Sequence, residues 1–162
     1  MAGSSVGAAK TIMVAVDESE ESMNALQWAL DNLLTQNNDQ HIIVMHAEVP
    51  ASSKVGLGGQ AVASSGHRVL EIAERSENLI TQRVLARARE ISDKRNVTVD
   101  FKVTVGEARY AICEAANKMG VDVLVVGSHG HGALKRAVVG SVSEHCTRRC
   151  KCRVMVIKKP YH

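Results

Sequence analysis

The chain has 162 residues, a length that suits a single domain built around one hydrophobic core. Its net charge is only +3 and aromatic residues make up 2% of it, so an aromatic-rich basic surface for nucleic acid is not expected. Four cysteines do not make a secreted disulfide framework, and no apolar run approaches the roughly 20 residues of a membrane span.

The N-terminus, Met1–Lys10, has no apolar core of the kind that a signal peptide requires. We therefore expect one domain over residues 1–162, cytoplasmic or at the nucleus or membrane periphery, with residues 1–9 as a flexible terminus. Nucleic acid is not expected as a partner.

The first half of the chain alternates short apolar runs with amphipathic stretches. Residues 11–16 predict a buried strand, and Asp17 or Ser19 is expected to cap the helix that follows. A second buried strand is predicted over residues 42–47. Residues 50–66 are rich in Ala, Ser and Gly, which indicates a mobile loop within the domain.

The second half begins with a long amphipathic helix, predicted over residues 67–94. Its apolar side is formed by Val69, Ile72, Ala73, Leu79, Ile80, Val84, Ala88 and Ile91. Residues 97–105 alternate in polarity, which predicts a half-buried strand at a sheet edge. The remaining predicted elements are a helix over 108–119, a central strand over 121–126, a glycine-rich loop, a helix over 141–149 and a last strand over 153–158.

This regular alternation of strands and helices predicts an α/β fold. Right-handed crossovers then give an open, mostly parallel sheet of five strands with helices on both faces. In such sheets ligands bind beyond the carboxyl ends of the strands, where the winding direction reverses. Asp17, Ala47 and Gly127 each follow the end of a predicted strand, so we expect them to converge on one crevice.

The glycine-rich loop after residue 126 is the most informative motif. Gly127, Gly130 and Gly140 precede a predicted helix, a place where backbone N–H groups and a helix N-terminus can hold a phosphate. The spacing does not fit a P-loop, which requires Gly-Lys-Ser/Thr, nor the dinucleotide fingerprint, because no glycine follows the first strand.

The spacing Gly127-x2-Gly130-x9-Gly140-Ser141 resembles the nucleotide-binding signature of the universal stress protein family. The run Val14-Ala-Val-Asp17-Glu-Ser19 is similar to the family's first strand and acidic turn. Further similarity, to the small single-domain plant members of the ATP-binding subgroup, covers almost the whole chain from Lys10 to Pro160.

The resemblance implies a Rossmann-like sheet with strand order 3-2-1-4-5, as in adenine nucleotide alpha hydrolases, and a pocket for ATP or AMP. The residues implied for that pocket are Val16, Asp17, Ala47, Gly127, His129, Gly130, Gly140, Ser141, Val142 and Ser143. The first three would contact adenine or ribose, the next three the ribose and α-phosphate, and the last four the β/γ end. The implied role is that of a sensor or regulatory module, and the last strand, Arg153–Lys158, is expected to pair two copies into a homodimer.

Catalysis is not indicated by the same residues. ATP hydrolysis requires a placed metal ion and a residue that orients the attacking water. The loop from Gly127 to Ser143 contains no acidic residue, so any magnesium would be carried with the phosphates and water. We expect at most slow hydrolysis, no catalytic residue and no resident metal. His129 and His131 are expected to serve binding, and His46 is expected to be a hydrogen-bonded core residue.

The cysteines provide an alternative of a different class. Cys146, Cys150 and Cys152 lie close together among arginines and lysines, whose charge opposes a divalent metal ion and favours thiolates. A redox-responsive, chaperone-like oligomer controlled by this cluster is therefore the second hypothesis.

Overall fold

A computed structural model of the chain describes residues 10–37, 39–55, 66–128 and 140–160. Five parallel strands form one sheet in the order β3-β2-β1-β4-β5, as the family resemblance implied. Their bounds are β1 Thr11–Ala15, β2 His41–Glu48, β3 Asp100–Val105, β4 Val123–Gly127 and β5 Arg153–Ile157. The predicted α/β fold class is confirmed.

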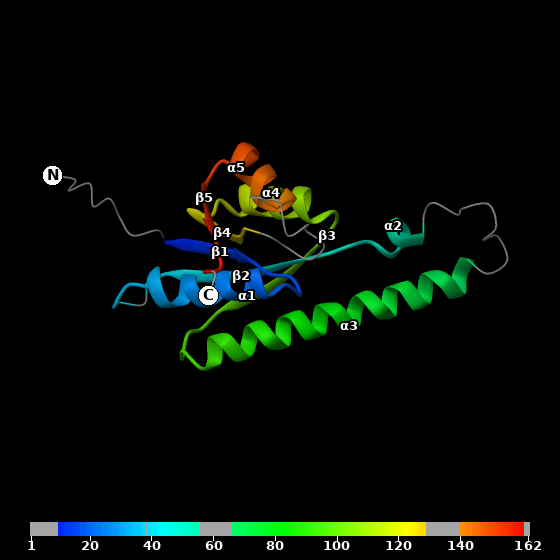
Figure 1. Cartoon of the computed structure of the whole chain (residues 1–162), viewed down its shortest axis with the longest axis horizontal. Helices are drawn as coiled ribbons and strands as arrows, with labels where there is room; N and C mark the ends of the chain where they lie inside the picture. The colour runs from blue at the N-terminus through cyan, green and yellow to red at the C-terminus, as the bar shows by residue number, and fades with distance from the viewer. Residues whose placement is uncertain (1–9, 38, 56–65, 129–139, 161–162) are drawn as a thin grey trace.

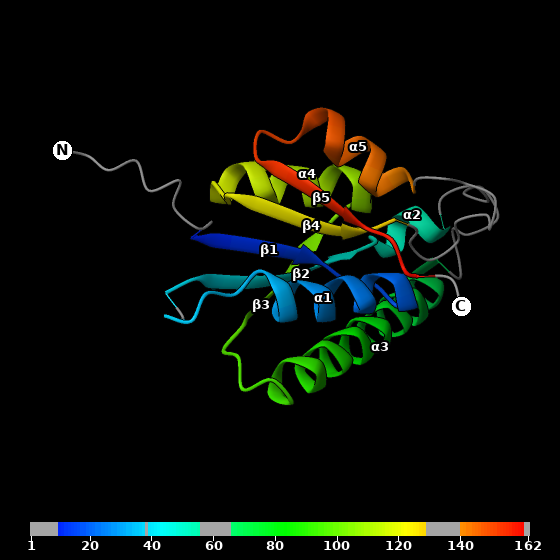
Figure 2. The same ribbon diagram turned by 60° about the vertical axis from the view of Figure 1, so that its left-hand side comes forward.

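The helices cover both faces of this sheet (Figure 2). On one face lie α1 (Glu20–Asn32) and α3 (Gly66–Asp93), and on the other lie α4 (Ala108–Met119) and α5 (Ser141–Arg149). Each of these helices connects two parallel strands, so the winding direction reverses between β1 and β4. That reversal is where a ligand of an open α/β sheet is expected.

Strand residues alternate between two core clusters, one on each face of the sheet. Ile12, Val14 and Val125 pack beneath α1 and α3, whereas Met13 and Leu124 pack beneath α4 and α5. All five side chains are almost completely buried. Burial of each such side chain contributes roughly 1.5–3 kcal/mol, so both faces hold the sheet between its helices.

The long helix α3 departs from its predicted burial at its N-terminal half. Val69, Ile72 and Leu79 were expected on the apolar side, but 39%, 64% and 53% of their surfaces are exposed. Val84, Ala88 and Ile91 of the predicted apolar side are buried, and all three lie in the C-terminal half. The reason is visible in Figure 1, where the N-terminal part of α3 runs out beyond the sheet and has no strand to pack against.

Several element boundaries also differ from those predicted. A short helix, α2 (Ala51–Val55), forms where a loop was expected, and residues 56–65 of that loop lie outside the described residues. The edge strand β3 begins at Asp100, three residues later than predicted. Among the described residues, no helix is long and apolar enough to cross a membrane.

Candidate functional site

The carboxyl ends of β1, β2 and β4 lie at one level of the sheet. Ala15 is the register partner of Met45, so Ala47 lies two residues beyond the last β1 pair. Val14 is the partner of Val125, which brings Gly127 level with the residues that follow β1. The predicted convergence of these strand ends follows directly from this parallel register.

A network of side-chain hydrogen bonds shapes the turn after β1. Asp17 Oδ1 accepts from the Ser19 backbone N–H at 2.8 Å, and from the Ser19 hydroxyl. Ser19 is the N-cap of α1, and its Oγ accepts from the Ser22 N–H at 3.2 Å. Ser19 is therefore the N-cap of α1, and the Asp17 carboxylate holds Ser19 in place through these two hydrogen bonds. This arrangement holds the Asp17 carboxylate at the sheet edge.

The side chain of Ser22 closes the same turn from inside the helix. Its hydroxyl oxygen accepts from the Asp17 N–H at 3.0 Å, and the Asp17 carbonyl oxygen lies 3.1 Å from it. Ser22 is almost completely buried. The sequence analysis did not identify this residue, although a serine three positions after the N-cap is a recognisable signal for such a network.

Gly127, at the end of β4, is required by the approach of α1. A Cβ atom on Gly127 would lie 2.9 Å from the Glu21 carbonyl carbon and 3.1 Å from the Ser22 nitrogen. Real Cβ atoms essentially never come within 3.0 Å of such atoms. The glycine thus lets the first turn of α1 rest on the strand end, which places the turn of Asp17 beside β4.

The N-terminus of α5 faces this region without a side-chain cap. Gly140 is the N-cap residue and offers no side-chain hydrogen bond. Its N–H donates to the Ser128 carbonyl, which anchors the start of α5 to the residue after β4. The first-turn N–H groups of an uncapped helix are the donors that an anion requires.

The residues that follow Gly140 are placed differently from one another. Ser141 is exposed at the first position of α5, whereas Ser143 is buried and its hydroxyl donates to the Gly140 carbonyl at 2.9 Å. Val142 packs against the same core cluster as Ala47, on the α4–α5 face of the sheet. Of the two residues whose hydroxyls were expected to face a phosphate, Ser141 is exposed, and the Ser143 hydroxyl is engaged with the Gly140 carbonyl.

Val16 contacts His46, the core histidine that was expected in β2. Val16 is buried, its N–H donates to the Met45 carbonyl at 2.9 Å, and His46 Nδ1 lies 3.0 Å from the Val16 carbonyl oxygen. Because a carbonyl only accepts, Nδ1 carries the proton. His46 is therefore the hydrogen-bonded core residue that was expected, through Nδ1, whereas its buried Nε2 has no hydrogen-bond partner among the described residues.

Eight of the ten predicted site residues lie within the described part of the chain, and His129 and Gly130 lie outside it. The eight all occupy the carboxyl edge of β1, β2 and β4 or the start of α5. The sequence analysis missed Ser128, whose carbonyl accepts from the Gly140 N–H. That contact joins two ends of the glycine loop and is not indicated by any local pattern.

The cysteines form a separate cluster behind α5, and α4 contributes Cys113 to it. Cys146 is completely buried, and burial raises its pKa to about 11. Burial also raises the pKa of the Cys150 and Cys152 thiols. The predicted thiolate character of these cysteines is therefore wrong, because burial raises their pKa values despite the nearby cationic residues. Among the described residues, no group of three His, Cys, Asp or Glu side chains could hold a metal ion.

Comparison with known proteins places this arrangement in a family. The universal stress protein family matches residues 8–158 of the chain. The chain belongs to that family. A similar relative, the universal stress protein PHOS34 of Arabidopsis thaliana, is 26% identical over 168 residues, which cover 95% of this chain and 64% of that protein. The chain thus spans about two thirds of that relative's length.

Solved structures of the family share the fold. A universal stress protein in complex with cAMP is 24% identical, with a TM-score of 0.65, over 93% of this chain and 97% of that one. A universal stress protein family protein of Arabidopsis thaliana with AMP bound is 22% identical, with a TM-score of 0.65, over 93% of this chain and 92% of that one. Both neighbours contain an adenine nucleotide.

Proposed function

We propose that this universal stress protein binds ATP or AMP at the carboxyl edge of β1, β2 and β4 and acts as a sensor or regulatory module in the stress response. The observation that carries the proposal is the uncapped N-terminus of α5, joined through Ser128 to the end of β4 at the point where the winding reverses. An anion at such a terminus gains about 0.3–1 kcal/mol from the helix dipole. The AMP and cAMP complexes of the structural neighbours support the choice of an adenine nucleotide.

The residues divide by chemistry between the two ends of the ligand. Asp17, as an acceptor held by the Ser19 N–H, suits a ribose hydroxyl or the adenine amino group. The Ala47 backbone and Val16 would border the base, with Gly127, His129 and Gly130 along the ribose and α-phosphate. Ser141, Val142 and Ser143 would offer their backbone N–H groups to the phosphates. Magnesium, where present, would arrive with the nucleotide.

The proposal is tested by locating the bound nucleotide on the protein. In a two-dimensional amide NMR titration with ATP or AMP, the signals of Asp17, Ala47 and Val142 should shift together. Gly140→Val should abolish these shifts, because its side chain would project into the phosphate position. The matched control is Gly120→Asn, at the left-handed end of α4 (φ 59°) with nothing within 4 Å of an added Cβ, which should titrate like the wild type. Shifts confined to α3 would contradict the proposed site.

The same proposal includes a homodimer through β5, in the cytoplasm of a plant-type host. β5 is one of the two edge strands of the sheet, and Val156 is 38% exposed on it. An exposed apolar edge of this kind favours antiparallel pairing with a second copy. Light scattering should give the mass of two chains, and Val156→Pro, which removes a backbone donor from the edge, should give the mass of one. An unchanged dimer in Val156→Pro would place the interface elsewhere.

A further inference from the structure

The peptide group between Val16 and Asp17 is held on both sides by side chains. Its carbonyl, that of Val16, accepts from His46 Nδ1 at 3.0 Å, and its N–H, that of Asp17, donates to the Ser22 hydroxyl oxygen at 3.0 Å. His46 belongs to β2 and Ser22 to α1, so two separate elements meet on one peptide. Because a peptide group is planar, fixing both of its polar atoms fixes the direction in which the chain leaves β1.

His46 reaches this peptide from a strand that is apolar on the same face. Ile42 and Val44, which share that face by the alternation of the strand, pack in the core cluster beneath α1 and α3. The Val16 N–H donates to the Met45 carbonyl at 2.9 Å, which places His46 beside Val16. The histidine is thus the polar end of an apolar row, at the point where β1 has just ended.

Packing alone does not account for a histidine at this position. Only 4% of its surface is exposed, and its Nε2 has no hydrogen-bond partner among the described residues. A buried polar atom without a partner costs free energy, whereas an apolar side chain like those of Ile42 and Val44 would fill the same space without that cost. Positions that break a local packing rule are typical of functional sites. The use of His46 therefore lies in the donor at Nδ1.

The residue that this peptide orients is Asp17, whose carboxylate is proposed to contact the ribose or the base. Its Oδ1 accepts from the Ser19 N–H at 2.8 Å, and its carbonyl oxygen lies 3.1 Å from the Ser22 hydroxyl. The backbone on both sides of Asp17 and its side chain are therefore held by hydrogen bonds. An acceptor held in this way loses little conformational entropy on binding.

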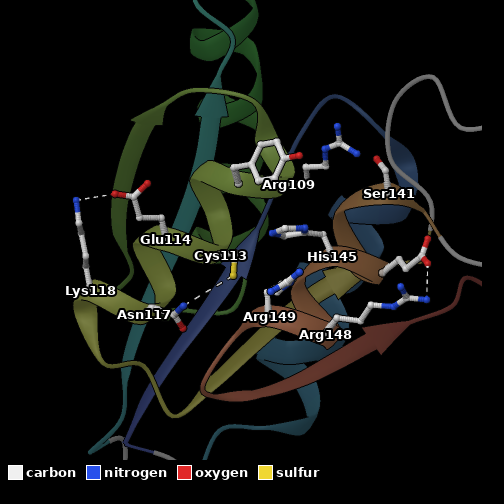
Figure 3. A pocket seen from close by; sticks show the side chains of 11 residues that line it. Arg109, Cys113, Glu114, Asn117, Lys118, Ser141, His145, Arg148 and Arg149 are labelled. Carbon is white, nitrogen blue, oxygen red and sulfur yellow. Dashed lines mark hydrogen bonds and ion pairs between the residues drawn. The ribbon is translucent and has the colours of Figure 1, made fainter.

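The phosphate end of the proposed site is built differently. Ser141 is exposed at the start of α5, beside the pocket between α4 and α5 (Figure 3). The donors expected there are backbone N–H groups, which the helix itself positions. His46 shares the opposite face of the sheet with Val44. A change at His46 is therefore expected to alter the nucleoside end of the site and not the phosphate end.

We propose that His46 is a positioning residue for nucleotide binding. Through its hydrogen bond to the Val16 carbonyl it holds the Asp17 carboxylate in the orientation that the nucleoside requires, while Ser22 holds the other side of the same peptide. This role rests on the proposed function, because it concerns how the adenine-nucleotide site is held. His46 acts through Asp17 and not by contact with the nucleotide.

The test is isothermal titration of the full chain and its variants with ATP and with AMP. His46→Leu keeps an apolar core and removes the donor, and it should weaken binding at least about threefold, the equivalent of one ordinary hydrogen bond. His46→Asn should restore most of the affinity, because asparagine Nδ2 is as many bonds from Cβ as histidine Nδ1. The matched control is His41→Leu, an exposed histidine at the first residue of β2, which should bind like the wild type.

Two further readouts separate positioning from a general effect on the fold. In an Asp17→Ala background, His46→Leu should cause no additional loss of affinity, because the group through which it acts is gone. In amide NMR spectra of the nucleotide-free protein, His46→Leu should shift the Asp17 signal. At saturating ATP the Val142 signal of His46→Leu should still move as in the wild type.

Equal affinity of His46→Leu and His41→Leu would overturn the positioning role, and so would losses that add fully in the double variant with Asp17→Ala. Loss of the ATP-induced shift at Val142 as well as at Asp17 would assign His46 to the stability of the fold instead. Wild-type protein that binds neither ATP nor AMP would refute the proposed function itself, and the positioning role with it.

Discussion

Gly127→Ala provides a direct test of how the strand end and the first turn of α1 fit together. The added Cβ would lie 2.9 Å from the Glu21 carbonyl carbon, whereas ordinary contacts begin at 3.4 Å. The clash is with backbone, so no side chain can rotate away, and α1 must move by a few tenths of an ångström. Overpacking of this kind costs about 1–3 kcal/mol.

The assay is urea and thermal unfolding followed by circular dichroism. For a domain of this size, each kcal/mol lowers Tm by roughly 2–4 °C, so we expect a loss of about 2–12 °C. The control is Gly120→Asn, because asparagine tolerates the left-handed conformation and nothing lies within 4 Å. If Gly127→Ala unfolds at the same midpoint as the wild type, the close approach of α1 to β4 does not constrain this position.

Three further predictions concern other parts of the fold. Asp122 accepts from the Thr11 N–H at 2.9 Å, so Asp122→Ala should lower the free energy of unfolding by about 1 kcal/mol, measured by urea titration. The hydrogen bond from Arg95 lowers the pKa of Asp31 in the folded protein. This exposed pair therefore stabilises the fold fully at pH values above the pKa that the carboxyl has in the unfolded chain. The stabilisation is lost as the pH falls through the lower pKa of the folded state. Asp31→Asn should therefore cost no more than about 1 kcal/mol at pH 7 and progressively less in acid, and a loss that grows in acid would contradict this sign. Because burial raises the pKa of Cys146 to about 11, iodoacetamide at pH 8 should modify it only after denaturation, and rapid labelling of the native protein, read by peptide mass spectrometry, would contradict its burial.

The strand–helix alternation was readable from the sequence because each buried strand is a short apolar run, and each crossover helix has a local period. The strand order came from the resemblance of the glycine spacing to a family. The burial of α3 was not readable in the same way. Val69 and Val84 fit the same helical period, but only Val84 is buried against the sheet. The period of apolar residues along a helix does not show how far the sheet beneath it extends.

In the candidate site, too, features set by neighbouring residues were predicted, whereas contacts between distant residues were not. The turn of Asp17 and the start of α5 were predicted because their signals, an acidic residue after a strand and a glycine before a helix, are local. The contact of Gly127 with Glu21 joins positions far apart in the chain, and no sequence pattern expresses it. The cysteines were misjudged because the sequence shows cationic neighbours but not burial.

The central claim is that the carboxyl edge of this sheet holds an adenine nucleotide. Isothermal titration calorimetry of nucleotide-free protein with ATP and with AMP tests it most directly. We predict saturable heat with at least one of them, at one nucleotide per chain, and a weakened response in Asp17→Ala. A correctly folded wild-type protein that gives no heat and no change in Tm with either nucleotide would contradict the claim.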